Sequence, residues 1–120
     1  MDKAFNKNKL EIRFFKTSAG QEPVRKWLKK LTIEEKHSIG VDIKIIEFNW
    51  PLGMPSVRSL GDGMWELRSN LPTNKIARII FFIHKKQVIL LHGFIKKTQK
   101  TPTQEITLAK RRKHQFEVNM

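Results

Sequence analysis

The chain has 120 residues, of which 39% are hydrophobic and 29% are charged, a balance typical of a small globular domain and unlike that of a disordered tail or a coiled coil. It contains no cysteine, which excludes a disulfide scaffold, a thiolate zinc site and a cysteine nucleophile. Lysine and arginine total 24 against 11 acidic residues, and the resulting net charge of +13 predicts an anionic partner such as nucleic acid.

The pattern of apolar residues predicts neither a membrane span nor a secretory signal. No apolar run approaches the length of about 18 residues that a spanning helix needs, and the first residues lack an apolar core segment. We therefore expect a cytoplasmic protein without a membrane partner. We expect it to form one domain over residues 1–120, with residues 1–9 as a frayed end.

The first half of the chain predicts one strand followed by two helices. Residues 10–15 alternate as a strand does. A helix then begins near Pro23, and its buried stripe follows the helical spacing i, i+3, i+4, i+7: Val24, Trp27, Leu28 and Leu31. Residues 32–35 form a capping box, so a second helix begins there and ends near Asn49, because Pro51 cannot continue it. Two helices so close in sequence predict a helical hairpin.

The second half predicts mainly strands. A glycine-rich turn at residues 61–63 separates the first two of four expected strands: 57–60, 64–68, 76–84 and 88–95. The last two are apolar on both faces, which is typical of central strands. A second capping box at residues 101–104 predicts a basic C-terminal helix from about Pro102 to about Phe116. The fold class is therefore α+β: a small, mainly antiparallel sheet with the helical hairpin packed on it.

Arg78 is the most unusual residue of the central strands. A buried guanidinium must be paired or must open on a cleft, so Arg78 either pairs with Glu66, Asp62 or a carbonyl, or binds an anion. If residue 83 pairs with residue 88, Arg78 lies opposite Gly93, and the missing side chain would leave room for a ligand.

Two further positions are candidates on the predicted strands. Glu66 and Arg68 share one strand face, while Trp65 and Leu67 share the other, which we expect to be core. The face of Arg68 then either lines a site or is solvated. His92 interrupts an apolar strand; such a histidine is more often a hydrogen-bonded core residue than a catalyst, and both interpretations stay open.

Basic residues gather after the last strand and in the last helix. Lys96, Lys97 and Lys100 lead into a helix N-terminus, where backbone N–H groups also favour phosphate. A second run, which partly suits the helix dipole, offers further contacts to RNA: Lys110, Arg111, Arg112 and Lys113. The sequence has no phosphate-binding loop or Ser-His-Asp set, and its acidic residues are too sparse for two metal ions. We expect neither a metal nor a cofactor.

Three segments together resemble the RelE/ParE toxin superfamily, most closely its HigB-like branch with phage-derived members. They are Trp65–Arg68, Arg78–Phe81 and Leu90–Pro102. The resemblance implies a compact sheet carrying an N-terminal helical hairpin. It also implies a metal-free endoribonuclease that cuts messenger RNA in the ribosomal A site. A cognate helix-turn-helix antitoxin would silence it and would carry the only contact to operator DNA.

The resemblance also implies roles for single residues. Arg68 and Arg78 match the family's strand arginines, and Lys96 and Lys97 match its basic pair. Many such nucleases use a tyrosine in the last helix, but this chain has no tyrosine. Histidine and acidic residues serve other HigB-like toxins, which makes His92 and Glu66 the candidate proton acceptors.

Two other functions fit the same sequence. A ParE-like inhibitor of DNA gyrase would share the fold and cut nothing. A non-catalytic RNA-binding module would share the positive charge and arrest no growth.

Overall fold

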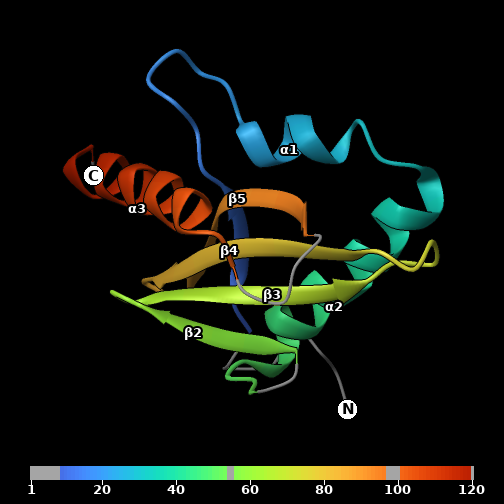
Figure 1. The fold of residues 1–120 in the computed structure, drawn as a ribbon. Coiled ribbons are helices and arrows are strands. Elements are labelled where there is room, and N and C mark those ends of the chain that lie inside the picture. Colours follow the sequence, from blue (N-terminus) through green and yellow to red (C-terminus); the bar gives the residue numbers. More distant parts are fainter. Residues whose placement is uncertain (1–8, 54–55, 97–100, 120) are drawn as a thin grey trace.

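The computed structural model describes residues 9–53, 56–96 and 101–119. The elements follow one another as strand, two helices, four strands and a final helix (Figure 1). Their bounds are β1 Glu11–Phe14, α1 Pro23–Leu28, α2 Ile33–Asn49, β2 Val57–Gly61, β3 Met64–Asn70, β4 Ile76–His84, β5 Gln87–Lys96 and α3 Thr103–Val118. No helix in this described part is long and apolar enough to cross a membrane. The predicted frayed end lies outside the described residues, except for Lys9.

The five described strands form one mixed sheet in the order β1-β5-β4-β3-β2. Only the β1–β5 pair is parallel, and the other three pairs are antiparallel. The α+β class and the mainly antiparallel sheet are therefore confirmed. The prediction that β4 and β5 are inner strands is also confirmed, and it explains why both are apolar on both faces.

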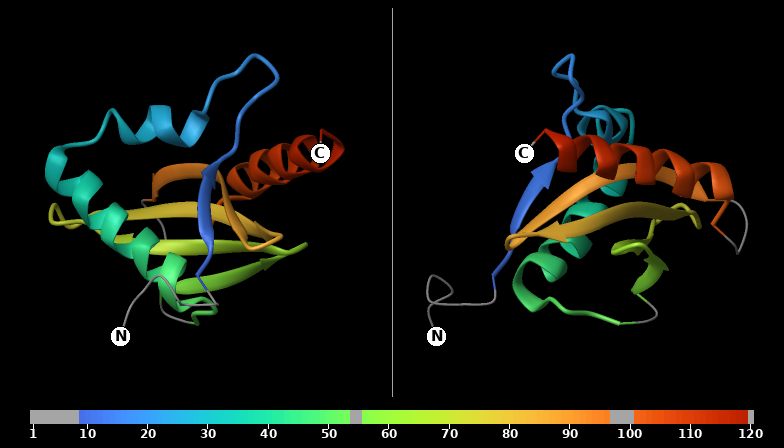
Figure 2. Two further views of the ribbon diagram at one scale, coloured as in Figure 1. Left: turned by 180° about the vertical axis from the view of Figure 1, so that it is seen from behind. Right: turned by 90° about the vertical axis from the view of Figure 1, so that its left-hand side faces the viewer.

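Helices cover both faces of the sheet (Figure 2). Residues of α1 and α2 pack on the face that carries Ile79 and Phe81, which we call the α1/α2 face. Residues of α3, among them Ala109, pack on the face that carries Ile80 and Phe82, which we call the α3 face. Two separate apolar clusters therefore form the core, one on each side of the sheet.

The helical hairpin is not confirmed. The helix α1 ends at Leu28, earlier than predicted, and α1 and α2 diverge instead of lying along each other (Figures 1 and 2). The main neighbour of α1 is β5, whereas that of α2 is β3. The first capping box is confirmed, because Thr32 Oγ1 accepts from the Glu35 N–H at 3.1 Å and Glu35 Oε1 accepts from the Thr32 N–H at 3.0 Å. Val24 of α1 and Ile39 and Ile46 of α2 are buried in the apolar cluster on the α1/α2 face of the sheet.

The register between β4 and β5 matches the prediction next to the turn and differs from it beyond a bulge. Ile83 does lie opposite Val88, across a turn in which Lys85 and Lys86 both have positive φ, 48° and 65°. A bulge after Ile80 then shifts the pairing by one residue.

This shift changes the partner of Arg78. Arg78 lies opposite Phe94, and Gly93 lies opposite Ile79, so the predicted pairing of Arg78 with Gly93 is wrong. A Cβ at position 93 would come within 2.5 Å of the Trp27 ring. Gly93 therefore makes room for an indole from α1 and not for a ligand.

The second capping box is also wrong. The helix α3 begins at Thr103 after Pro102, without a side-chain cap, and it runs to Val118, two residues beyond the predicted end. Thr101 does not cap the helix, because its hydroxyl donates to Glu66.

Candidate active site

Arg78 forms a buried ion pair with Glu66. Arg78 is 2% exposed on β4 and Glu66 is 0% exposed on the neighbouring β3. Arg78 Nη1 donates to Glu66 Oε1 at 2.6 Å. Glu66 is therefore the partner of Arg78 among the three acceptors that the sequence left open. Without this carboxylate a buried guanidinium would be very costly.

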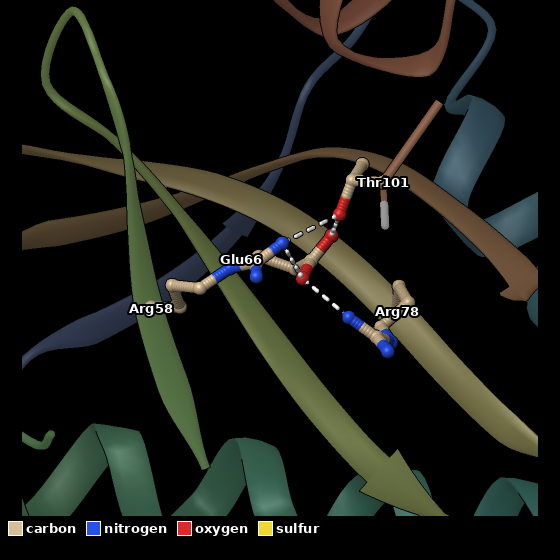
Figure 3. Close-up of polar contacts among 4 residues, drawn as sticks. All are labelled: Arg58, Glu66, Arg78 and Thr101. Carbon is tan, nitrogen blue, oxygen red and sulfur yellow. Dashed lines mark hydrogen bonds and ion pairs between the residues drawn. The ribbon is translucent and has the colours of Figure 1, made fainter. Parts of the chain in front are cut away.

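Glu66 also connects two other parts of the chain (Figure 3). Thr101, just before α3, donates its hydroxyl to Glu66 Oε2. Arg58 on β2 places Nη2 3.5 Å from Glu66 Oε1 and 3.0 Å from Thr101 Oγ1. Both carboxylate oxygens are therefore occupied, and one glutamate joins β2, β4 and the entry to α3.

Two more cations lie near this pair. Arg68 is the register partner of Arg78 and is partly exposed, and Lys96 at the end of β5 is 8% exposed. Burial lowers the pKa of Lys96, and the positive charge of Arg78 lowers it further, while Glu66 opposes this effect. Arg58 and Arg68 also lower it.

Four residues therefore act electrostatically on Lys96: Arg58, Glu66, Arg68 and Arg78. We call these five residues the cationic cluster. Four cations face one carboxylate in this cluster, so its net charge is positive. Arg78 Nε is buried and has no hydrogen-bond partner among the described residues. Buried donors are rarely left unsatisfied. An oxygen of a bound anion is a partner that would satisfy this one.

His92 faces α3 and not the cationic cluster. Its Nε2 lies 2.7 Å from Glu105 Oε1, its Nδ1 lies 3.4 Å from Arg112 Nη1, and its ring stacks on Phe94. Burial lowers the pKa of His92 below its usual 6.5, although Glu105 opposes this effect. A neutral imidazole is therefore favoured at neutral pH, and no hydrogen bond in the described chain links it to Glu66 or Arg78.

The basic run of α3 divides into structural and exposed side chains. Arg112 donates to the Leu91 carbonyl at 2.8 Å, and Lys113 pairs with Glu117 at 2.9 Å. Lys110 is exposed and pairs with Asp62 at 2.7 Å, while Arg111 is exposed. Lys97 and Lys100 lie outside the described residues.

Two cavities lie away from this cluster. One of about 580 Å³ lies between β1, the β4–β5 turn and the C-terminal end of α3, and its lining includes Arg13, Lys85 and Phe116. No member of the cationic cluster lines it. Within the described ranges, no group of three or more acidic or histidine side chains could hold a metal ion.

Comparison with known proteins assigns a family. Residues 26–114 match the sequence model of the phage-derived Gp49-like proteins. The chain belongs to this family. The Gp49-like proteins are a RelE-like toxin family. No curated protein matches the chain as a relative. The matched region runs from α1 into α3 and contains the whole cationic cluster.

Sequence reasoning did not identify two of the residues that contact Glu66, namely Arg58 and Thr101. The turn at residues 61–63 did carry a signal for the first, because counting outward from Asp62 in a hairpin places Arg58 opposite Glu66, as observed. The capping pattern predicted Thr101 as a helix cap because it considers only neighbouring residues. It does not include a buried carboxylate from elsewhere in the chain, such as Glu66, that competes for the hydroxyl.

Proposed function

We propose that this Gp49-like protein is the toxin of a type II toxin–antitoxin system and a metal-independent endoribonuclease that cuts messenger RNA on the ribosome. The cationic cluster carries the proposal, because it combines four cations, one of which is the buried Arg78 guanidinium whose Nε has no hydrogen-bond partner among the described residues. The net charge of +13 and the family's toxin character support it.

The cluster fits the chemistry of RNA cleavage without a protein-bound metal. The 2′-hydroxyl of RNA attacks the adjacent phosphorus, negative charge grows on the phosphate oxygens, and the bond to the 5′-oxygen breaks. Arg68 is more exposed than Arg78 and makes the first phosphate contact, while Arg78 stabilises the charge of the transition state. Preorganised donors of this kind contribute by being held in place before the reaction.

Lys96 and Glu66 take different roles. The lowered pKa of Lys96 makes its ammonium a better acid than an ordinary lysine, which suits proton donation to the leaving 5′-oxygen. Glu66 is fully buried with both oxygens hydrogen-bonded, so it positions Arg78 and does not accept the proton of the 2′-hydroxyl. His92 is the remaining candidate acceptor, and to take the proton it would have to give up the contact of its Nδ1 with Arg112, which is the longer of its two contacts. Lys97 would make a further phosphate contact.

The proposal includes the partners that accompany such a toxin. A cognate helix-turn-helix antitoxin would neutralise it and would make the contacts to operator DNA. The ribosome would align the message, so free RNA would be a poor substrate.

Primer extension on a translated message after brief induction tests the proposal. We expect new 5′ ends within the coding region, none on a message whose start codon is removed, and none with Arg68→Ala. Pretreating the purified toxin with chelator should leave cleavage unchanged. Growth arrest without new 5′ ends but with inhibited supercoiling would instead indicate a gyrase inhibitor. RNA binding without growth arrest would indicate a non-catalytic module.

A further inference from the structure

The outer face of α2 is apolar, although nothing in the described chain covers it. Four large hydrophobic residues are exposed in the described chain, and three of them are in α2: Ile33 at 78%, Val41 at 45% and Ile45 at 41%. Their spacing of eight and four residues places them on one face of the helix, in a row that also contains the exposed His37. The opposite face of α2 is already buried against β3 through Ile39 and Ile46. A helix that is apolar on both sides is typically covered on both.

A second row of residues runs beside the apolar one. Lys36, Gly40 and Lys44 follow one another at intervals of four and are all exposed. No carboxylate of the described residues lies within ion-pair distance of either lysine. A Cβ at Gly40 would meet nothing within 4 Å. Glycine weakens a helix interior relative to alanine, but it lets another backbone approach closely.

We propose that this face of α2 binds an amphipathic, acidic helix of a protein partner. Its apolar stripe would cover Ile33, Val41 and Ile45. Its carboxylates would pair with Lys36 and Lys44 while its backbone passes over Gly40. The apolar row disfavours RNA, which has no matching apolar stripe.

Charge also decides between such a partner and a second copy of this chain. A two-fold axis through Gly40 would place Lys36 of one copy opposite Lys44 of the other, so the flanking rows would repel. Each copy also carries a net charge of +13. An acidic partner has neither problem.

Leu67, Ile79 and Ile95 belong to the apolar cluster on the α1/α2 face. Because successive residues of a strand point to opposite faces, the neighbouring Glu66, Arg78 and Lys96 lie on the α3 face, on the other side of the sheet from α2. A partner bound to α2 leaves the cluster accessible. The inference therefore needs only a protein partner and does not rest on the proposed nuclease activity. The antitoxin of the proposed function is one chain that could supply the helix.

A synthetic peptide of about three heptads, with a leucine stripe and glutamate flanks, is the probe. Its binding to the full chain is followed by fluorescence anisotropy. We expect Val41→Ser with Ile45→Ser to weaken binding at least about tenfold. The matched control is Val118→Ser, because Val118 is 62% exposed but lies on α3, and it should leave binding unchanged. Gly40→Leu should weaken binding by blocking the close approach.

The charge pattern gives the second arm of the test. Lys36→Glu with Lys44→Glu should weaken binding of the glutamate peptide and improve binding of the same peptide with lysine flanks. All substituted positions are exposed, and circular dichroism checks that each variant is folded. The proposal is overturned if the α2 variants bind as the wild type does, or if wild type binds both peptides equally. A dimer in sedimentation equilibrium that Val41→Ser dissociates would assign the face to a second copy instead.

Discussion

Removing the carboxylate of Glu66 while keeping its shape should destabilise the protein strongly. The substitution Glu66→Gln leaves Arg78, whose side chain is 3% exposed, without an anionic partner. Breaking a buried pair in this way costs about 3–5 kcal/mol. Arg58 loses the same partner at smaller cost, because its side chain is 38% exposed and water can solvate it. With a urea m-value of about 2 kcal/mol/M, the unfolding midpoint should fall by about 2 M.

A double variant separates charge burial from lost packing. Glu66→Gln with Arg78→Met removes both buried charges, so it should recover most of the stability that the single variant loses. The matched control is Glu47→Gln, which removes the partner of Lys9 from a surface pair 3.7 Å long. This control should cost less than about 1 kcal/mol.

Urea unfolding, followed by tryptophan fluorescence, gives the free energy of unfolding of the wild type, the two single variants and the double variant. The reasoning is refuted if Glu66→Gln costs no more than Glu47→Gln. It is also refuted if the double variant is less stable than Glu66→Gln alone, since the pair would then not be the source of the loss.

Three further predictions follow from single side chains. Burial lowers the pKa of Lys96 below 10.5, so the cleavage rate should begin to fall with rising pH earlier than it would if an ordinary lysine were the acid. Lys96→Arg should abolish this decline at alkaline pH in a pH–rate profile. An unchanged decline would show that Lys96 is not the acid. His92 binds fewer protons when folded than when unfolded, so the free energy of unfolding should fall as pH drops through 6.5, and His92→Gln should reduce this slope in urea titrations; an equal slope would contradict the burial effect. Gly93→Ala should lower the free energy of unfolding in urea by about 1–3 kcal/mol, because the new Cβ would lie 2.5 Å from the Trp27 ring. Trp27→Leu in the same chain should reduce this loss. If the losses of the two single variants simply add in the double variant, the clash with Trp27 is not the cause.

Local signals in the sequence predicted most of the elements. Pro23 marks the start of α1, because proline has no N–H and the first N–H groups of a helix have no partner within it. The Thr32–Glu35 capping box marks the start of α2, because its side chains accept from such N–H groups. Both signals are local in the sequence. The relation between α1 and α2 was not predictable in this way. Both apolar stripes could pack on each other or on the sheet, and only the three-dimensional structure shows which contact forms.

The candidate site was predictable only in part, because its residues come from distant parts of the chain and local signals do not show which of them meet. The pairing of Glu66 with Arg78 was one of several possibilities, because a buried guanidinium needs an acceptor but its sequence position does not show which acceptor is near. The bulge places one extra residue, Leu91, between the partners of Ile80 and Phe81, and nothing in the apolar run Val88–Leu91 marks it, so the neighbour of Arg78 was misjudged by one residue. The hydroxyl of Thr101 could cap a helix or serve a carboxylate, and the long-range contact prevailed.

The most direct test of the central claim is the cleavage rate of a message held in purified ribosome complexes at saturating toxin. Arg68 is the residue of choice, because it is partly exposed and its loss leaves the buried pair of Glu66 and Arg78 intact. We predict that Arg68→Ala slows cleavage by about 10²-fold or more, as loss of a preorganised transition-state donor does. Lys30→Ala, which removes an exposed cation following α1, should leave the rate unchanged. Equal rates for wild type and Arg68→Ala, or no cleavage by the wild type, would contradict the account.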